Sequence, residues 1–223
     1  VTEQKKNQPM FMPYPSDQTF YGYFNDFMTY TATDWTITST DAGGDSGEVI
    51  QATSSAGGAL LITTNDADND SEELQLKGEA FKLSTSKKAY FSARFKLSDA
   101  TESDMLLGLT ITDTTAIDGV SDGVFFKKDD GDTNLDFVVE KDSTETATAA
   151  VGTVANDTFI TATFFIDPDR SKVYYSINNA APVGVVNTNL PDDEELTVTI
   201  AVQAGAAAAK SLTVDYVSAI VER

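Results

Sequence analysis

Acidic residues that could bind a metal ion surround one glycine in the segment FFKKDDGDTNLDFVVEKD, residues 125–142. Asp129, Asp130 and Asp132 supply carboxylate oxygens, which are ligands that Ca²⁺ prefers. Alternating apolar and polar residues flank them, and Gly131 can adopt the positive φ of a tight turn. The segment therefore predicts a β-hairpin with an acidic turn, and a solvated loop is favoured over a calcium site.

A second acidic segment, DADNDSEE, begins like a calcium-binding loop. Asp66, Asp68 and Asp70 repeat the first three ligand positions of such a loop. The match then ends, because Ser71 replaces the glycine of the sharp turn and Lys77 replaces the bidentate glutamate. These three aspartates are weak calcium candidates, and the alternative is a charged loop between strands. We expect no other metal or cofactor.

The residue types limit the possible catalysis to carboxylate chemistry. The chain contains no Cys and no His, which excludes disulfides, thiolate nucleophiles, zinc sites built from those residues and Ser-His-Asp triads. Two carboxylates can hydrolyse a glycosidic bond, and Asp136 with Glu140 is the candidate pair, flanking Val138 on a predicted strand. The alternative is that these positions form the solvent-facing side of that strand, which we favour. Trp35, the single Trp, is expected in the core.

Charge and composition exclude several classes of partner. The chain has 35 acidic and 15 basic residues and a net charge of −20, so nucleic acid and anionic membranes are not expected partners. The absence of disulfides fits synthesis in a reducing cytoplasm. The sequence has neither a signal-peptide pattern nor an apolar run long enough for a membrane span. We therefore expect an unprocessed soluble protein.

From Trp35 onward, short runs rich in Val, Ile, Thr, Phe and Tyr alternate with Gly, Asn, Asp and Ser clusters. This spacing predicts an all-β, antiparallel β-sandwich. The expected strands cover residues 35–40, 47–53, 58–64, 73–83, 88–97, 104–112, 123–128, 135–141, 158–167, 172–178, 181–187, 196–204 and 211–221. In KAYFSARFKL, the alternation predicts that Phe91, Ala93, Phe95 and Leu97 face the core. The alanine-rich stretch QAGAAAAKS is expected to be a loop.

The first 27 residues differ from the rest of the chain. They contain three of the six prolines and seven aromatic residues, without a helical or strand period. This composition predicts an extended arm, residues 1–27, before a single sandwich domain, residues 28–223. The arm either packs on its own domain or contacts a neighbouring subunit. The aromatic residues expected to make that contact are Phe11, Tyr14, Phe20, Tyr21, Tyr23 and Phe24.

The closing segment SLTVDYVSAIVE resembles the last strand of concanavalin A-like and laminin-G-like jelly rolls. Four longer segments also resemble, in order, tailed-bacteriophage structural proteins with a laminin-G-like jelly roll. They are FNDFMTYTATDWTITSTDAG, YFSARFKLSDATESDMLLGLTITDTT, DGVFFKKDDGDTNLDFVVEKDST and TNLPDDEELTVTIAVQAGAAAAKSLTVDYV. The closely spaced Glu and Asp residues that mark the glycosidase branch of the superfamily are absent.

The resemblance implies a virion component, made in the host cytoplasm, that acts as a capsid decoration (cement) protein on the outer capsid surface. Its expected partners are the major capsid protein and other copies of itself in a dimer or trimer. The alternatives are a carbohydrate-binding adhesion module on the virion head or tail and a carboxylate-only glycosidase. Because the resemblance supplies no catalytic residue, we expect that the chain is not an enzyme.

Overall fold

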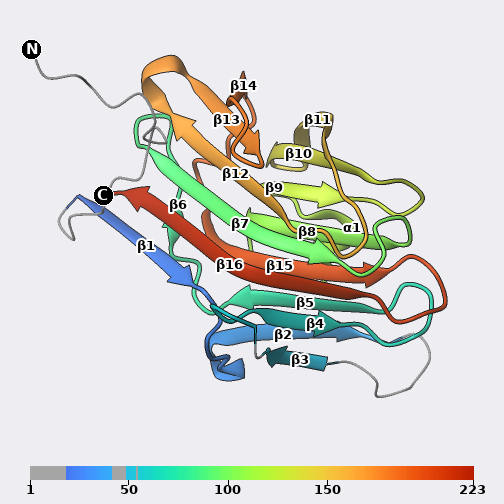
Figure 1. The fold of residues 1–223 in the computed structure, drawn as a ribbon. Helices are drawn as coiled ribbons and strands as arrows, with labels where there is room; N and C mark the ends of the chain where they lie inside the picture. The colour runs from blue at the N-terminus through green and yellow to red at the C-terminus, as the bar shows by residue number, and fades with distance from the viewer. Residues whose placement is uncertain (1–18, 42–48, 54) are drawn as a thin grey trace, which may run out of the picture.

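Alternating apolar residues place two antiparallel sheets face to face in the computed structural model, which describes residues 19–41, 49–53 and 55–223. Sheet A runs in the order β14 (Val183–Val186), β13 (Lys172–Ile177), β12 (Ile160–Asp167), β7 (Ala89–Leu97), β16 (Ser211–Glu222), β4 (Leu60–Thr63) and β3 (Val49–Ala52), and β1 (Phe20–Asn25) also pairs with β16. Sheet B runs in the order β11 (Thr144–Thr153), β10 (Asn134–Lys141), β9 (Gly123–Lys128), β8 (Ser103–Thr110), β15 (Glu195–Ala204), β5 (Ser71–Leu76) and β2 (Trp35–Thr40), with β6 (Phe81–Lys82) paired to β15. The predicted all-β sandwich is confirmed (Figure 1).

Helical structure is confined to three short turns in the described residues: η1 (Ala32–Asp34), α1 (Ala116–Gly119) and η2 (Pro168–Arg170). The alanine-rich segment before β16 is a loop, as predicted, because it offers no apolar stripe for packing. Among all the described residues, no helix is long and apolar enough to cross a membrane.

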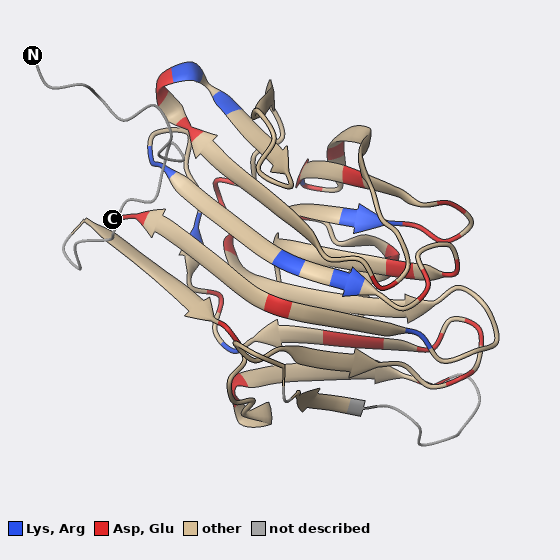
Figure 2. Cartoon of the chain, in the orientation of Figure 1, with Lys and Arg blue, Asp and Glu red and all other residues tan. Residues whose placement is uncertain are grey.

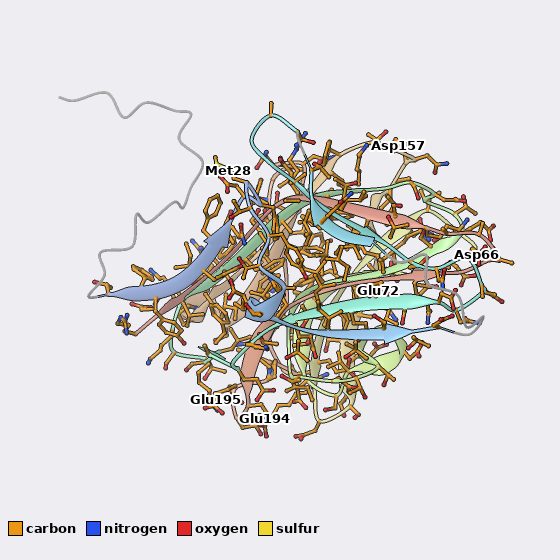
Figure 3. The ribbon with its side chains drawn as sticks, turned by 90° about the horizontal axis from the view of Figure 1, so that it is seen from below. Met28, Asp66, Glu72, Asp157, Glu194 and Glu195 are labelled. Atoms are coloured by element: carbon orange, nitrogen blue, oxygen red, sulfur yellow. The ribbon has the colours of Figure 1, made fainter. Side chains whose placement is uncertain are left out.

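A cluster of phenylalanines joins the two sheets at the centre of the core. Phe164 of sheet A lies 5.1 Å from Phe91, 5.9 Å from Phe137 and 6.3 Å from Phe126, measured between ring centroids. All four rings are fully buried, and Figure 3 shows side chains filling the space between the sheets. On β7, Phe91, Ala93, Phe95 and Leu97 are all buried, which confirms the predicted alternation. Trp35 is also buried, as predicted.

Most predicted strands are confirmed with boundaries shifted by one or two residues. The predicted strand 73–83 instead divides into β5 and β6 around Gly78, whose φ of 89° breaks the extended backbone. Strand β11 was not predicted, because its sequence TETATAAVGT has few large apolar residues. It forms by pairing with β10, and tertiary context therefore determines it more than local propensity does.

The predicted arm differs from the structure at its C-terminal end. Residues 20–25 form β1, which pairs with β16 from Phe20 opposite Glu222 to Asn25 opposite Val217. Phe27 is fully buried and packs against Trp35. This part of the predicted arm therefore belongs to the sandwich and packs on its own domain, because its aromatic side chains gain buried surface there. Phe11 and Tyr14 lie outside the described residues.

Within β1, alternate aromatic side chains face opposite sides of the sheet. Tyr21 stacks on Phe81, and its hydroxyl oxygen accepts a hydrogen bond from the Lys82 amide. Tyr23 packs edge-on against Trp35. Phe20 is half-buried on the outer side, whereas Phe24 is 65% exposed. Of the four predicted contact residues in β1, Phe24 therefore retains the most surface for another molecule.

Truncation of Phe164 should destabilise the fold more than truncation of an exposed phenylalanine. We expect Phe164→Ala to lower the free energy of unfolding by about 3 to 5 kcal/mol, because it leaves a cavity between the sheets. The matched control, Phe24→Ala, should change it by less than about 0.5 kcal/mol. Chemical denaturation followed by tryptophan fluorescence measures both values. Similar losses in the two variants would contradict the central role of Phe164.

Candidate functional site

The acidic turn between β9 and β10 lies beside a buried lysine side chain. The predicted hairpin is confirmed, with Gly131 at a φ of 84°. Lys128 is 1% exposed, and its Nζ donates hydrogen bonds of 2.7 Å to the carbonyl oxygens of Ser103 and Asp129. Burial lowers the pKa of this ammonium, while four nearby aspartates act in the opposite direction. A buried lysine therefore supplies positive charge next to the predicted acidic turn.

The carboxylates of this turn form hydrogen bonds within the protein. Asp132 accepts from the backbone and side-chain nitrogens of Asn134, and these bonds lower the pKa of its carboxyl. Asp104, on β8, accepts from the backbone nitrogen of Asp130 at 2.7 Å. These contacts close and orient the turn.

In the second acidic segment, DADNDSEE, the three aspartates predicted as calcium candidates lie in different environments. Asp66 and Asp68 are exposed, and Asp66 lies at the rim of the sandwich in Figure 3. Asp70 is fully buried, and its Oδ2 accepts a hydrogen bond of 2.7 Å from the Ala67 amide. Among the described residues, no group of three or more Asp, Glu, His or Cys side chains is placed to hold a metal ion. Calcium binding by this chain stays a prediction.

The predicted carboxylate pair lies on the outer face of β10 but is widely spaced. Glu140 lies four positions after Asp136, so their Cα atoms are about 13 Å apart along the strand. Glycosidases need about 5 to 9.5 Å between their carboxyl groups. Asp136 accepts a hydrogen bond from the Ala150 amide, and burial beside Glu145 raises the pKa of Glu140. The two side chains occupy separate environments.

A segment of the chain itself covers the outer face of sheet B. Residues 111–122, which include α1, cover apolar side chains that point away from the main core. This second cluster comprises Leu106, Val120, Phe125, Val138 and Ala201, with Ile111 and Ile117 packed against it. The centre of this sheet face is therefore a small apolar core.

Two polar residues of β5 anchor the covering segment. Glu73, which is 2% exposed, accepts hydrogen bonds from the amides of Ala116 and Ile117. Burial raises the pKa of Glu73, and these two bonds act in the opposite direction. Gln75 accepts from the Asp113 amide and donates to the Ile111 carbonyl. These side chains are committed to holding the segment in place.

The outer face of sheet A is organised as three rows that cross the strands. The apolar row takes one residue from each of six adjacent strands: Gly22, Ile220, Tyr90, Phe165, Tyr174 and Gly184. The hydroxyl row lies beside it and consists of Ser218, Ser92, Thr163 and Ser176. The charged row lies on the other side and consists of Glu222, Lys88, Asp167 and Lys172. Figure 2 shows acidic and basic residues together at this end of the sheet. The sheet register therefore places an apolar stripe between two polar borders.

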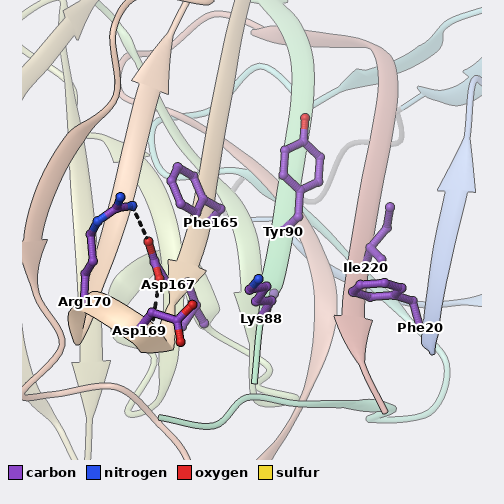
Figure 4. Close-up of a pocket in the computed structure, with 10 residues that line it drawn as sticks. Phe20, Lys88, Tyr90, Phe165, Asp167, Asp169, Arg170 and Ile220 are labelled. Atoms are coloured by element: carbon purple, nitrogen blue, oxygen red, sulfur yellow. Dashed lines mark hydrogen bonds and ion pairs between the residues drawn. The ribbon is translucent and has the colours of Figure 1, made fainter. Parts of the chain in front are cut away.

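A pocket of about 390 Å³ lies where the apolar row meets the charged row. Phe20, Tyr90, Phe165 and Ile220 form its apolar part and lie side by side across four strands (Figure 4). All four side chains are half-buried.

Charged side chains border the pocket. Lys88, Asp167, Asp169 and Arg170 line it, and the last three belong to η2 or its N-cap. Asp167 accepts hydrogen bonds from Arg170 Nη1 at 2.7 Å and from the Asp169 amide at 3.1 Å, and Figure 4 draws both contacts. The aromatic rings can contact an apolar ligand surface while the charged groups bind hydroxyls at its edge.

Tyr90, Phe165 and Tyr174 were absent from the predicted site. The sequence nevertheless contains an indication of them, because FF in TFITATFFID and YY in KVYYSIN are consecutive aromatic residues in strands. Neighbouring residues of a strand point to opposite faces, so one ring of each pair must leave the core. Phe164 and Tyr175 face inward, and Phe165 and Tyr174 stack outside with 4.8 Å between ring centroids.

Several solved structures have folds similar to that of this chain, whereas its sequence has no comparable match. No protein-family model matches the chain, and no curated protein matches its sequence. SCLam, a non-specific endo-β-1,3(4)-glucanase from family GH16, has a TM-score of 0.65 at 15% identity, over 97% of this chain and 95% of that chain. An endo-1,3-β-glucanase from Streptomyces sioyaensis has a TM-score of 0.61 at 16% identity, covering 95% and 99%. The carbohydrate recognition domain of Emp46p has a TM-score of 0.60 at 10% identity, covering 88% and 94%.

These likenesses show that the chain has a concanavalin A-like jelly-roll fold, as the sequence predicted. They also overturn the prediction that the chain is not an enzyme, because two of the structures are endo-glucanases that share nearly the whole fold. That prediction rested on a resemblance that supplies no catalytic residue and on a missing acidic motif, whereas the glucanases show that glycoside hydrolysis occurs on this fold. None of the three structures is named as a virion protein, so the phage setting stays a prediction from the sequence resemblance.

The acidic turn should depend on Lys128 rather than on its neighbour Lys127. We expect Lys128→Met to lower the free energy of unfolding by roughly 2 to 5 kcal/mol, because the carbonyls of Ser103 and Asp129 lose their donor. Lys127→Met should cost less than about 1 kcal/mol, because the Lys127 side chain is 33% exposed and lies 3.7 Å from Asp129. Urea denaturation at neutral pH measures both. Equal losses would show that the buried ammonium does not organise the turn.

Proposed function

We propose that the protein binds carbohydrate on the outer face of sheet A, with the pocket beside Tyr90 and Phe165 as the centre of the site. The observation that carries this proposal is the apolar row between a hydroxyl row and a charged row. A sugar ring has the same division, with C–H groups on its faces and hydroxyls around its edge. The fold supports the proposal, because similar structures include a carbohydrate recognition domain and glucanases.

The width of the apolar row favours a sugar over a lipid or a protein helix. Along β7, the row contributes only Tyr90, and Ser92 on one side and Lys88 on the other belong to polar rows. Ser92 itself is 2% exposed and bonded to Thr163. A ligand with a broad apolar face would cover the half-buried members of these rows, such as Thr163 and Lys88, without satisfying them, at a cost in free energy. A sugar can instead place its hydroxyls over them and form hydrogen bonds.

The hydrogen-bonding groups at the edges of the site are already ordered. Ser92 Oγ lies 2.9 Å from Thr163 Oγ1 and 3.3 Å from the Tyr216 hydroxyl. Asp167 holds Arg170 by an ion pair at the border of the pocket. A ligand that binds here therefore requires little ordering of side chains, which favours affinity.

The resemblance to tailed-bacteriophage structural proteins supplies a setting for this activity. In our proposal, the protein is a virion component on the outer surface of the particle, and glycan binding helps the particle adhere. The major capsid protein or a second copy of the chain would then hold it in place, with Phe24 available for such a contact. Phe24 lies opposite Ser218 of the hydroxyl row, so the capsid decoration role predicted from the sequence would place the capsid contact beside the bound glycan on the same face.

Removal of the pocket aromatics should weaken glycan binding without unfolding the protein. We expect Tyr90→Ala and Phe165→Ala each to lower the affinity at least about tenfold, because each removes a stacking surface. The control Ile37→Ala removes a partly exposed apolar side chain from sheet B and should leave binding unchanged. A glycan array identifies ligands, and isothermal titration measures their affinity for the four proteins. A blank array, or equal affinity in all four, would overturn the proposed function.

Hydrolysis of the bound glycan is a second candidate function. Asp167 and Asp169 line the same pocket. Glycoside hydrolysis ordinarily uses two carboxylates at one site. Arg170 and the Asp169 amide keep Asp167 in a fixed position. Asp169 is exposed and can approach a ligand directly.

If the protein hydrolyses glycans at this pocket, Asp169→Asn should abolish cleavage while preserving binding. The substitution keeps the size of the side chain but removes its acid–base capacity. Reducing-end formation from β-1,3-glucan and mixed-linkage glucan is the measurement, with Asp66→Asn as an exposed acidic control far from the pocket. No reducing ends from the unmodified protein, or full activity in Asp169→Asn, would contradict hydrolysis at this site.

A further inference from the structure

We infer that the ligand is an internal stretch of a linear, uncharged polysaccharide that crosses the strands of sheet A along the apolar row. This inference rests on the proposed function and specifies the ligand and its direction. Three features of the row lead to it: its length, its two ends and the distribution of charge around it.

The apolar row is longer than the pocket. It crosses six strands that lie about 4.8 Å apart, which gives a length of about 24 Å. The pocket lies over the part of the row formed by β16, β7 and β12, with Phe20 of β1 beside it. Beyond the pocket, the Tyr174 ring on β13 continues the surface, because it stacks nearly parallel to Phe165, with 8° between the ring planes. One sugar ring can occupy the pocket, and the rest of the row can contact further rings.

Both ends of the row are glycines. Gly22 lies on β1 and Gly184 on β14, the two strands at the ends of the row. A Cβ atom at position 184 would lie 2.8 Å from Cε1 of Tyr174, so the tyrosine ring occupies the space beside this glycine. Within the described residues, the two end positions of the row therefore contribute no side chain that could form a wall. A site that recognises a chain terminus needs such a wall, and this row instead suits a chain that continues past both edges.

Charge near the row favours an uncharged ligand. Neither the apolar row nor the hydroxyl row contains a charged residue. In the charged row, acidic and basic residues alternate, and the backbone amide of Lys88 donates to the carboxylate of Glu222. The border therefore offers no excess of either sign, while the net charge of −20 repels anionic polysaccharides.

A length series of oligosaccharides tests the inference. The probes are linear, uncharged oligosaccharides of two to seven units with β-1,3-glucan, β-1,4-glucan, β-1,4-mannan and β-1,4-xylan backbones. We expect the affinity of at least one series to rise at least about tenfold between the disaccharide and the hexasaccharide. Isothermal titration with the full chain measures each affinity.

Tyr174→Ala locates the additional contacts. Tyr174 does not line the pocket, so its removal should weaken binding of the hexasaccharide by about fivefold or more and leave the disaccharide unchanged. The disaccharide is the internal control, because its unchanged affinity would show that Phe165 keeps its position. Equal losses for both lengths would contradict a ligand that extends beyond the pocket.

The results of the array, the length series and the Tyr174→Ala variant distinguish failure of this inference from failure of the proposed function. If an array ligand loses affinity in Tyr90→Ala but binds independently of length, or is charged or branched, the inference fails and the proposed function stands. If no glycan binds, the proposed function fails and the inference fails with it. A rise of affinity with length that Tyr174→Ala removes would support both.

Discussion

The packing of one aromatic cluster between the two sheets is the interaction on which the rest of the structure depends. Phe164 of sheet A stacks on Phe91 of the same sheet and contacts Phe126 and Phe137 of sheet B, and this cluster fixes which side of each strand faces inward. A shift of one residue in any of these strands would expose the rings and bury polar neighbours. The side chains that must face inward therefore determine which side chains of the same strands face outward.

The composition of the two outer faces follows from this constraint. On sheet B, the outward-facing side chains include Leu106, Phe125 and Val138, and the chain covers them with residues 111–122. On sheet A, the outward-facing set forms rows that are apolar, hydroxylic or charged. The difference explains why the candidate site lies on sheet A. It also places the site away from Asp136 and Glu140, which belong to sheet B.

The fold could be predicted from the sequence to a large extent, because period-two alternation is strong in strands such as β7 and β16. The predictions failed where pairing outweighs composition, as in β11, and where aromatic residues obscured the alternation, as in β1. The site was harder to predict. Acidic clusters are obvious candidates in a chain without His or Cys, but backbone amides donate hydrogen bonds to carboxylates in both clusters. Only the three-dimensional register assembles Tyr90, Phe165 and Tyr174 into one row.

The buried ammonium of Lys128 has a consequence for the conditions under which the hairpin forms. In calcium-stabilised loops, a soluble ion must be captured before the acidic residues can come together. In this hairpin, the counter-charge is covalently attached and arrives with the strand itself. The acidic residues of the β9–β10 turn therefore come together around a positive charge that the chain itself supplies.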